Sequence, residues 1–139
     1  MTESPQHSWV RVMVLVGAAY VVIGVVFAAL DDSPDPNRVQ MWRLAAWAAS
    51  GATGAAHILY EQFQRGSAPL TTAMHAAGAI AIGAFGHGLA ANVHWLFAAP
   101  PGQRMPLLAL PLWPLITALP GFLLAFAAAF VLSRLSRRT

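Results

Sequence analysis

The sequence predicts an all-α fold, a transmembrane four-helix bundle, on three observations. Of its 139 residues, 58% are hydrophobic and only 9% are charged, and the mean hydropathy is +0.59. A soluble domain normally carries about 25% charged residues. Long stretches lack any Asp, Glu, Lys or Arg, and short loops separate them. We therefore predict one integral membrane domain, residues 1–139, whose surroundings are the lipid bilayer.

Each uncharged stretch supplies one predicted helix. The stretches run from Val12 to Leu30, from Leu44 to Tyr60, from Gly66 to Gln103 and from Met105 to Ser133. Because about 20 apolar residues cross the hydrocarbon layer, the two longer stretches hold one span each with flanking residues. Pro120 predicts a kink in the last helix. The predicted helices cover residues 10–30, 41–62, 70–97 and 112–133.

The loops and the arginines predict the topology. Residues 31–37 carry three Asp and two Pro, which predicts a loop that is neither helical nor buried in lipid. Residues 66–69 and 99–102 break the chain twice more, and such short loops favour an antiparallel up-down-up-down bundle. The arginine bias predicts N and C termini in the cytoplasm of a bacterial-type inner membrane. The cytoplasmic arginines are Arg11, Arg65, Arg134, Arg137 and Arg138, against Arg38, Arg43 and Arg104 outside.

Composition excludes several classes of function. The chain has no cysteine, which excludes disulfides, thiolate metal sites and thiol nucleophiles. Its eight basic residues are all arginine and are scattered, whereas a nucleic-acid groove needs them clustered on one face. We therefore predict no nucleic-acid partner. An enzyme is the least favoured class, because the sequence contains no recognised catalytic motif.

Two polar stripes carry the functional information. On a helical wheel the polar residues of the second helix gather around His57, and His and small residues share one side of the third helix. Bulky Phe85 and Leu89 lie opposite, where we expect lipid or a partner subunit. Ionisable side chains in a bilayer face the bundle interior, so the stripes are predicted to face each other. The predicted polar core consists of Arg43, Ser50, Thr53, His57, Glu61, His75, His87 and His94.

Distance from the turn near Gly66 predicts depth in the membrane. His57 and His75 are both nine residues from Gly66, so we expect them at one level near the cytoplasmic side, close to Glu61. The rings of the two histidines should then lie within hydrogen-bond or metal-bridging reach. The other ionisable residues of the stripes form a predicted outer group: Arg43, His87 and His94.

The inner group predicts a cofactor site or a structural network. His57, Glu61 and His75 offer the nitrogen and oxygen donors that Zn or Mn accepts. Two histidines at one level on adjacent helices also suit the axial positions of a haem. In the structural alternative the three side chains pair with one another, and Arg43 reaches water or meets an Asp of the first loop. The cofactor is left open between haem, a divalent metal and none.

Three functions follow, in order of preference. The lack of a soluble domain and the small-residue helix faces favour a non-catalytic accessory or scaffold subunit with a polar core between its helices. The alternative is a small proton-coupled carrier or channel that acts as an oligomer, since His titrates near neutral pH. The third is a haem- or metal-binding protein that uses His57 and His75. The first two imply partners in the membrane, either other subunits or further copies of the chain.

Overall fold

The computed structural model describes residues 5–98 and 107–136, and these residues form long helices. A π-helical turn, η1, connects the second helix to the third. Within the described residues there is no strand, so the all-helical prediction is confirmed. The predicted connection 99–102, and three arginines of the orientation argument, Arg104, Arg137 and Arg138, lie outside the described residues. The elements are α1 Pro5–Leu30, α2 Pro36–Leu59, η1 Tyr60–Gln64, α3 Pro69–Ala98 and α4 Ala109–Ser136.

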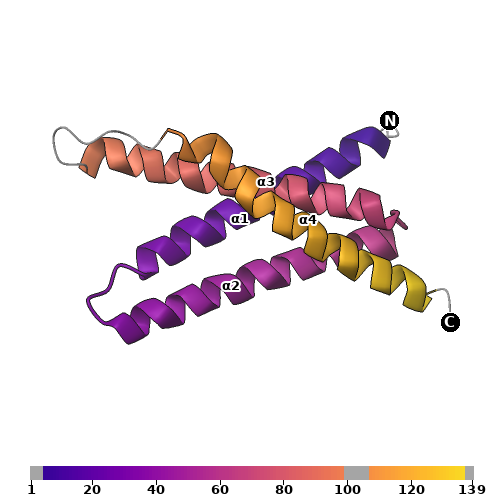
Figure 1. Ribbon diagram of the computed structural model, residues 1–139, viewed down its shortest axis with the longest axis horizontal. Helices are drawn as coiled ribbons and strands as arrows, with labels where there is room; N and C mark the ends of the chain where they lie inside the picture. The colour runs from indigo at the N-terminus through magenta and orange to yellow at the C-terminus, as the bar shows by residue number, and fades with distance from the viewer. Residues whose placement is uncertain (1–4, 99–106, 137–139) are drawn as a thin grey trace.

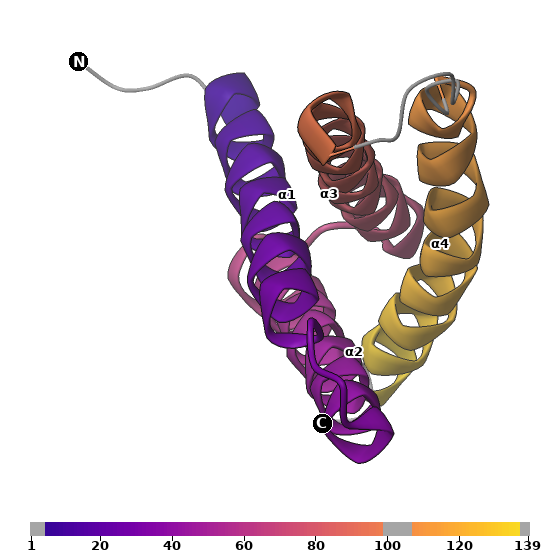
Figure 2. The same ribbon diagram turned by 90° about the vertical axis from the view of Figure 1, so that its left-hand side faces the viewer.

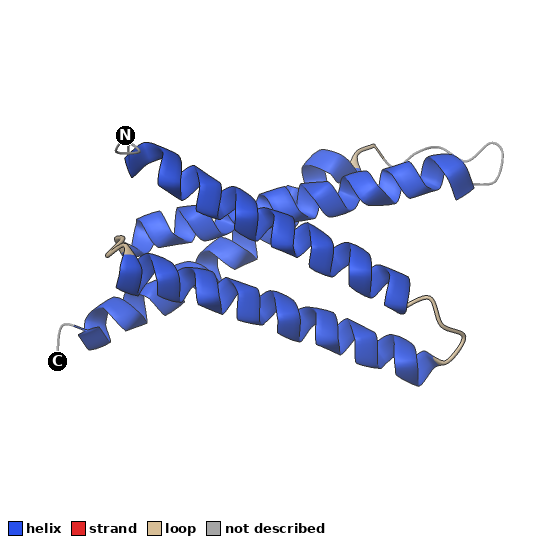
Figure 3. Ribbon diagram, turned by 180° about the vertical axis from the view of Figure 1, so that it is seen from behind, coloured by secondary structure: helices blue, strands red, loops and turns tan. Residues whose placement is uncertain are grey.

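Helix α3 is the central element, because it packs against both α1 and α4. Figures 1 and 2 show α3 between these two helices. At the end of the molecule that holds the α1–α2 loop, α1 lies between α2 and α4. Helix α2 packs mainly along α1 and touches α3 and α4 little. Figure 3 shows the start of α1, the α2–α3 connection and the end of α4 at one end of the molecule. The α1–α2 loop lies at the other end.

Three helices are long and apolar enough to cross a membrane, within the part of the chain that is described. The apolar segments are Ser8–Leu30, Pro69–Phe97 and Leu110–Ser136. Large apolar side chains cover the outside of the molecule, Leu108 and Leu124 among the most exposed. Length and composition thus fit a multi-pass membrane protein. Helix α2 is less apolar, because Arg, Gln, Ser, Thr and His interrupt its alanine-rich sequence.

Helix α2 begins earlier than predicted. Asp35 is its N-cap, and its Oδ1 accepts a hydrogen bond from the backbone N–H of Asn37 at 2.9 Å. Pro36 occupies the first turn, where a backbone N–H would have no carbonyl partner within the helix, so its absence costs no hydrogen bond. The prediction that residues 31–37 are all non-helical is therefore wrong at Pro36 and Asn37. Helix α4 likewise starts earlier, at Ala109.

Glycines bring α1 and α3 into close contact. A Cβ added at Gly83 would overlap the Cβ of Tyr20, and one added at Gly17 would lie 2.6 Å from Cγ2 of Ile82. Each glycine thus receives a side chain of the opposite helix, the small-residue packing that is common between membrane helices. Gly24, Gly78 and Gly86 make contacts of the same kind with His87, Met13 and Val21.

The α1–α3 contact predicts a clear effect of one methyl group. We expect Gly83→Ala to lower the free energy of unfolding by about 1–3 kcal/mol, the usual cost of overpacking, because the new Cβ overlaps Tyr20. Unfolding of the detergent-solubilised protein in SDS measures it. Gly88→Ala is the matched control, since a Cβ there only meets Leu110 Cδ2 at an ordinary 3.7 Å. Equal losses in both variants would contradict the glycine contact.

Candidate functional site

The candidate site forms where α2 turns into α3. The backbone makes the π-helical turn η1 and then reverses at Gly66, whose φ of +61° favours glycine. The backbone N–H of Ser67 donates to the carbonyl of Glu61 at 3.0 Å and closes the turn. π-Helical turns are rare and occur frequently at functional sites. This one carries the side chain of Glu61 into the bundle, where it is 1% exposed.

Four side chains surround the buried carboxylate of Glu61. Ser67 Oγ donates to its Oε2 at 2.6 Å. His75 Nδ1 lies 3.2 Å from the same oxygen, so the third helix reaches the carboxylate directly. The other oxygen, Oε1, lies 3.6 Å from Nη1 of Arg65 and 3.9 Å from Nε2 of His57. A buried carboxylate is costly unless charges and hydrogen bonds compensate it, and here one guanidinium and two imidazoles face it.

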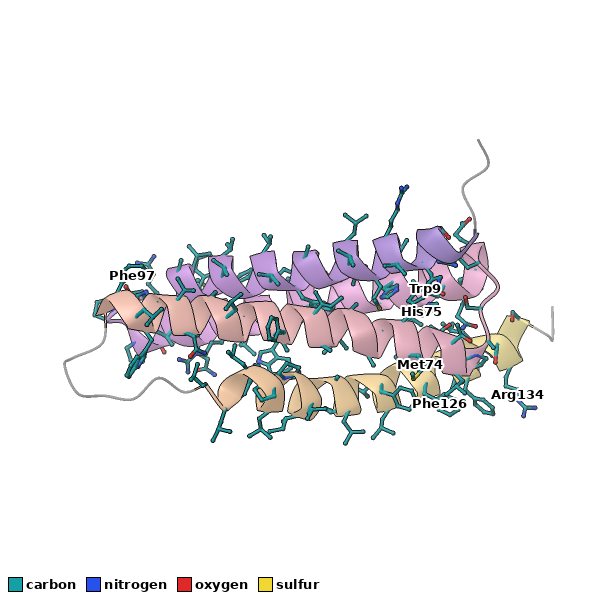
Figure 4. The ribbon with its side chains drawn as sticks, turned by 90° about the horizontal axis from the view of Figure 1, so that it is seen from above. Trp9, Met74, His75, Phe97, Phe126 and Arg134 are labelled. Atoms are coloured by element: carbon teal, nitrogen blue, oxygen red, sulfur yellow. The ribbon has the colours of Figure 1, made fainter. Side chains whose placement is uncertain are left out.

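Helix α1 completes the site through Trp9. Its ring is stacked on the imidazole of His75, with centroids 4.9 Å apart and planes at 3°. Figure 4 shows the two side chains next to each other between α1 and α3. His75 thus has the carboxylate of Glu61 on one side and an aromatic surface over its ring.

Gln62 ties the turn to the start of α3. Its Nε2 donates to Thr72 Oγ1 at 2.7 Å and to the Ser67 carbonyl at 3.0 Å. Thr72 is fully buried, and small apolar side chains of α3 and α4 lie beside it in the core: Ala73, Ala76 and Ala125. The polar cluster therefore lies directly against the apolar core.

The structure brings together the predicted inner group and separates the predicted outer group. His57, Glu61 and His75 meet as the distance from Gly66 predicts. Arg43 instead pairs with Asp31 of the first loop at 2.9 Å, and its side chain is 69% exposed. This pairing is the one expected if the polar residues have a structural role. The others are dispersed: His94 is exposed, His87 is half-buried against α1, Ser50 is half-buried, and Thr53 Oγ1 donates to its own helix at Ala49.

The two stripes do not face each other along their length, because α2 packs on α1 and meets α3 mainly near the turn. Phe85 and Leu89 are exposed, on the side predicted for lipid or a partner. Sequence reasoning missed the side chains that complete the cluster from other positions: Trp9, Gln62, Arg65 and Ser67. Only Arg65 had a signal, since it follows Glu61 at the i, i+4 spacing of helical ion pairs.

The carboxylate of Glu61 has neighbours at both of its oxygens. Glu61 already faces the cation of Arg65 and accepts a hydrogen bond from Ser67. Among the described residues, no group of three or more His, Cys, Asp or Glu is arranged to hold a metal ion. Both imidazoles lie toward the carboxylate. A metal or haem bound by His57, Glu61 and His75 stays a prediction.

The buried carboxylate predicts a large cost of neutralisation. We expect Glu61→Gln to lower the free energy of unfolding by about 3 kcal/mol, because it leaves the partly buried guanidinium of Arg65 without its counter-ion. Asp31→Asn removes the exposed ion pair with Arg43 and should cost less than about 1 kcal/mol. SDS unfolding of both variants tests this. A smaller loss for Glu61→Gln than for Asp31→Asn would show that the cluster does not hold the turn.

Comparison with known proteins does not indicate a function for this chain. No protein-family model matches the chain, and no curated protein and no solved structure matches it significantly. Two features of the chain bear on its function: the buried cluster around Glu61, and the loosely packed helix α2, which contributes His57 to that cluster.

Proposed function

We propose that the chain is a small inner-membrane protein whose four helices cross the bilayer up-down-up-down, with both termini in the cytoplasm. Arginine placement supports this orientation. Arg11, Arg65 and Arg134 lie toward the end that holds the start of α1, η1 and the end of α4. Arg38, Arg43 and the acidic loop 31–35 lie toward the opposite end, so the described arginines number three against two. The excess of arginine marks the cytoplasmic side.

Within that membrane the protein acts as a non-catalytic accessory or scaffold subunit, and α2 is the observation that supports this role. Of the four helices it is the least apolar, yet it contacts α3 and α4 little. Trp47 is 78% exposed, and five small residues of the same helix are exposed as well: Ala48, Gly51, Ala52, Ala55 and Ala56. A helix of this composition gains more from a protein neighbour than from lipid on its free side.

The free side of α2 has the pattern of a helix-packing surface. Gly51 and Ala55 are four residues apart and exposed, and a Cβ added at Gly51 would meet no atom within 4 Å. Ala48 and Ala52 repeat the same spacing beside them. Small residues at this spacing let two membrane helices approach closely and pack. We propose that a helix of a partner subunit, or of a second copy, covers this surface.

Cross-linking tests the subunit role, since the chain has no cysteine of its own. We expect Gly51→Cys and Ala55→Cys to form covalent dimers or adducts with another membrane protein in native membranes under mild oxidation. Leu124→Cys is the control, because Leu124 is exposed on α4 and away from α2. Immunoblotting of non-reducing gels measures the products. Adducts at Leu124 alone, or at none of the three positions, would exclude this surface as the interface.

A second candidate function is proton-coupled transport by an oligomer of this chain. The supporting observation is the cluster itself, in which a carboxylate 1% exposed faces two imidazoles. Imidazole is the side chain whose charge changes near neutral pH, which suits a site that takes up and releases protons. A structural ion pair needs Arg65 alone, and the two histidines add groups that exchange protons.

Proton flux tests this second function. We expect the purified protein in liposomes to carry protons down a pH gradient, and Glu61→Gln to lower the rate by about a hundredfold, the usual contribution of a positioned proton-transfer group. A pH-sensitive dye inside the liposomes reports the flux. Asp32→Asn, in the exposed loop, should keep the wild-type rate. A wild-type rate in Glu61→Gln would rule out transport through the cluster.

A further inference from the structure

The two oxygens of the Glu61 carboxylate have different surroundings. Oε2 accepts the hydrogen bond from Ser67 Oγ at 2.6 Å and lies 3.2 Å from Nδ1 of His75. Oε1 is also buried, yet no group among the described residues donates a hydrogen bond to it. An unpaired buried carboxylate oxygen is costly, and buried polar atoms in folded proteins nearly always have a partner. Oε1 therefore requires a donor that the neighbouring side chains do not supply.

Two further polar atoms next to Oε1 also lack a partner. Nη1 of Arg65 lies 3.6 Å from Oε1, and Nε2 of His57 lies 3.9 Å from it. Both nitrogens are buried, and neither has a hydrogen-bond partner within the described part of the chain. An N–H···O hydrogen bond is about 2.7–3.2 Å long. The two nitrogens thus face Oε1 from distances that are too long for direct hydrogen bonds.

The π-helical turn accounts for the position of Arg65. In an α-helix, residues four apart lie on one face and contact each other, as His57, Glu61 and Arg65 would. Between Glu61 and Arg65 the backbone follows η1 instead, and the N–H of Arg65 donates to the carbonyl of Tyr60 at 3.3 Å. This bond spans five residues and makes a wider turn than the α-helical one. The guanidinium is therefore not aligned with His57 and Glu61 as it would be in a regular helix.

The charges next to Oε1 determine which ligand fits there. A cation would be repelled by the guanidinium of Arg65, and an anion would be repelled by the carboxylate of Glu61. A neutral molecule fits if it donates to Oε1 and to an unprotonated nitrogen of His57, and accepts from the N–H of Arg65. Water can donate two hydrogen bonds and accept two, so it satisfies all three atoms. Buried waters typically make about three hydrogen bonds to polar groups that are otherwise unpaired.

We propose that one buried water molecule binds between Glu61 Oε1, Arg65 Nη1 and His57 Nε2. A bridging water is the usual explanation for polar atoms that face each other across more than about 3.5 Å. The water connects His57 to the carboxylate and gives a hydrogen bond to an imidazole that is only 4% exposed. The proposal goes beyond both candidate functions and depends on neither, since a structural network and a proton-transfer site would each contain this water.

A crystal structure of the whole chain, grown from a lipid phase and at a resolution that shows ordered waters, tests the site. We expect one water within about 2.6–3.2 Å of each of the three atoms, the range of hydrogen bonds to oxygen and nitrogen. A structure in which no single water reaches Oε1, Nη1 and Nε2 would overturn the proposal. Direct hydrogen bonds from Arg65 and His57 to Oε1 would overturn it as well.

His57→Phe tests the third partner, because it keeps a flat ring and removes the nitrogen. We expect the water to be lost from its place beside Oε1. His94→Phe is the matched control, since His94 is exposed on α3, and it should leave the water in place. Equal SDS unfolding midpoints establish that both variants are folded. A water that keeps its position in His57→Phe would exclude His57 as a partner and overturn the three-atom site, and the wild-type structure decides the case if this variant does not fold.

Discussion

The close contact between α1 and α3 is the constraint on which the rest of the structure depends. Glycines on both helices receive side chains of the other, so the two helices pack at one register only. That register stacks Trp9 on His75 at one end of the pair and brings His87 against Gly24 further along. If α1 shifted by one residue along α3, Cβ atoms of one helix would overlap the other helix. The positions of the polar side chains therefore follow from apolar packing.

The buried charge of Glu61 explains why α2 is attached to α3 at its end, while along its length it contacts mainly α1. A carboxylate removed from water must find its partners within the protein. Arg65 and His57 come from the same segment of chain, whereas His75 comes from α3, so the end of α2 is tied to the start of α3. Beyond this point α2 has no comparable requirement to contact α3. Its small residues remain exposed and available to a partner.

How far the sequence predicts this site depends on distance from the turn. Positions equidistant from a reversal at Gly66 lie at similar depth near it, which explains why His57 and His75 both reach Glu61. Further away the same counting failed for Arg43 and His94, because helices diverge at angles that periodicity does not encode. A helical wheel states which residues share a face, but not which helix that face meets. A pattern of glycines likewise predicts that two helices approach closely, but it does not identify the side chain that packs against each glycine. The contact of Tyr20 with Gly83 could therefore not be predicted.

The glycines also bear on whether the polar interior is structural or functional. If packing were their only role, the side chains received by Gly24 and Gly54 would be apolar, as Ile82 is at Gly17. Instead an imidazole and a phenol occupy these sites, and an apolar side chain there would avoid the cost of burying an unpaired nitrogen. His87 fills the space beside Gly24 but leaves its buried Nδ1 without a hydrogen-bond partner. The glycines therefore admit polar rings into helix contacts that apolar side chains could also fill.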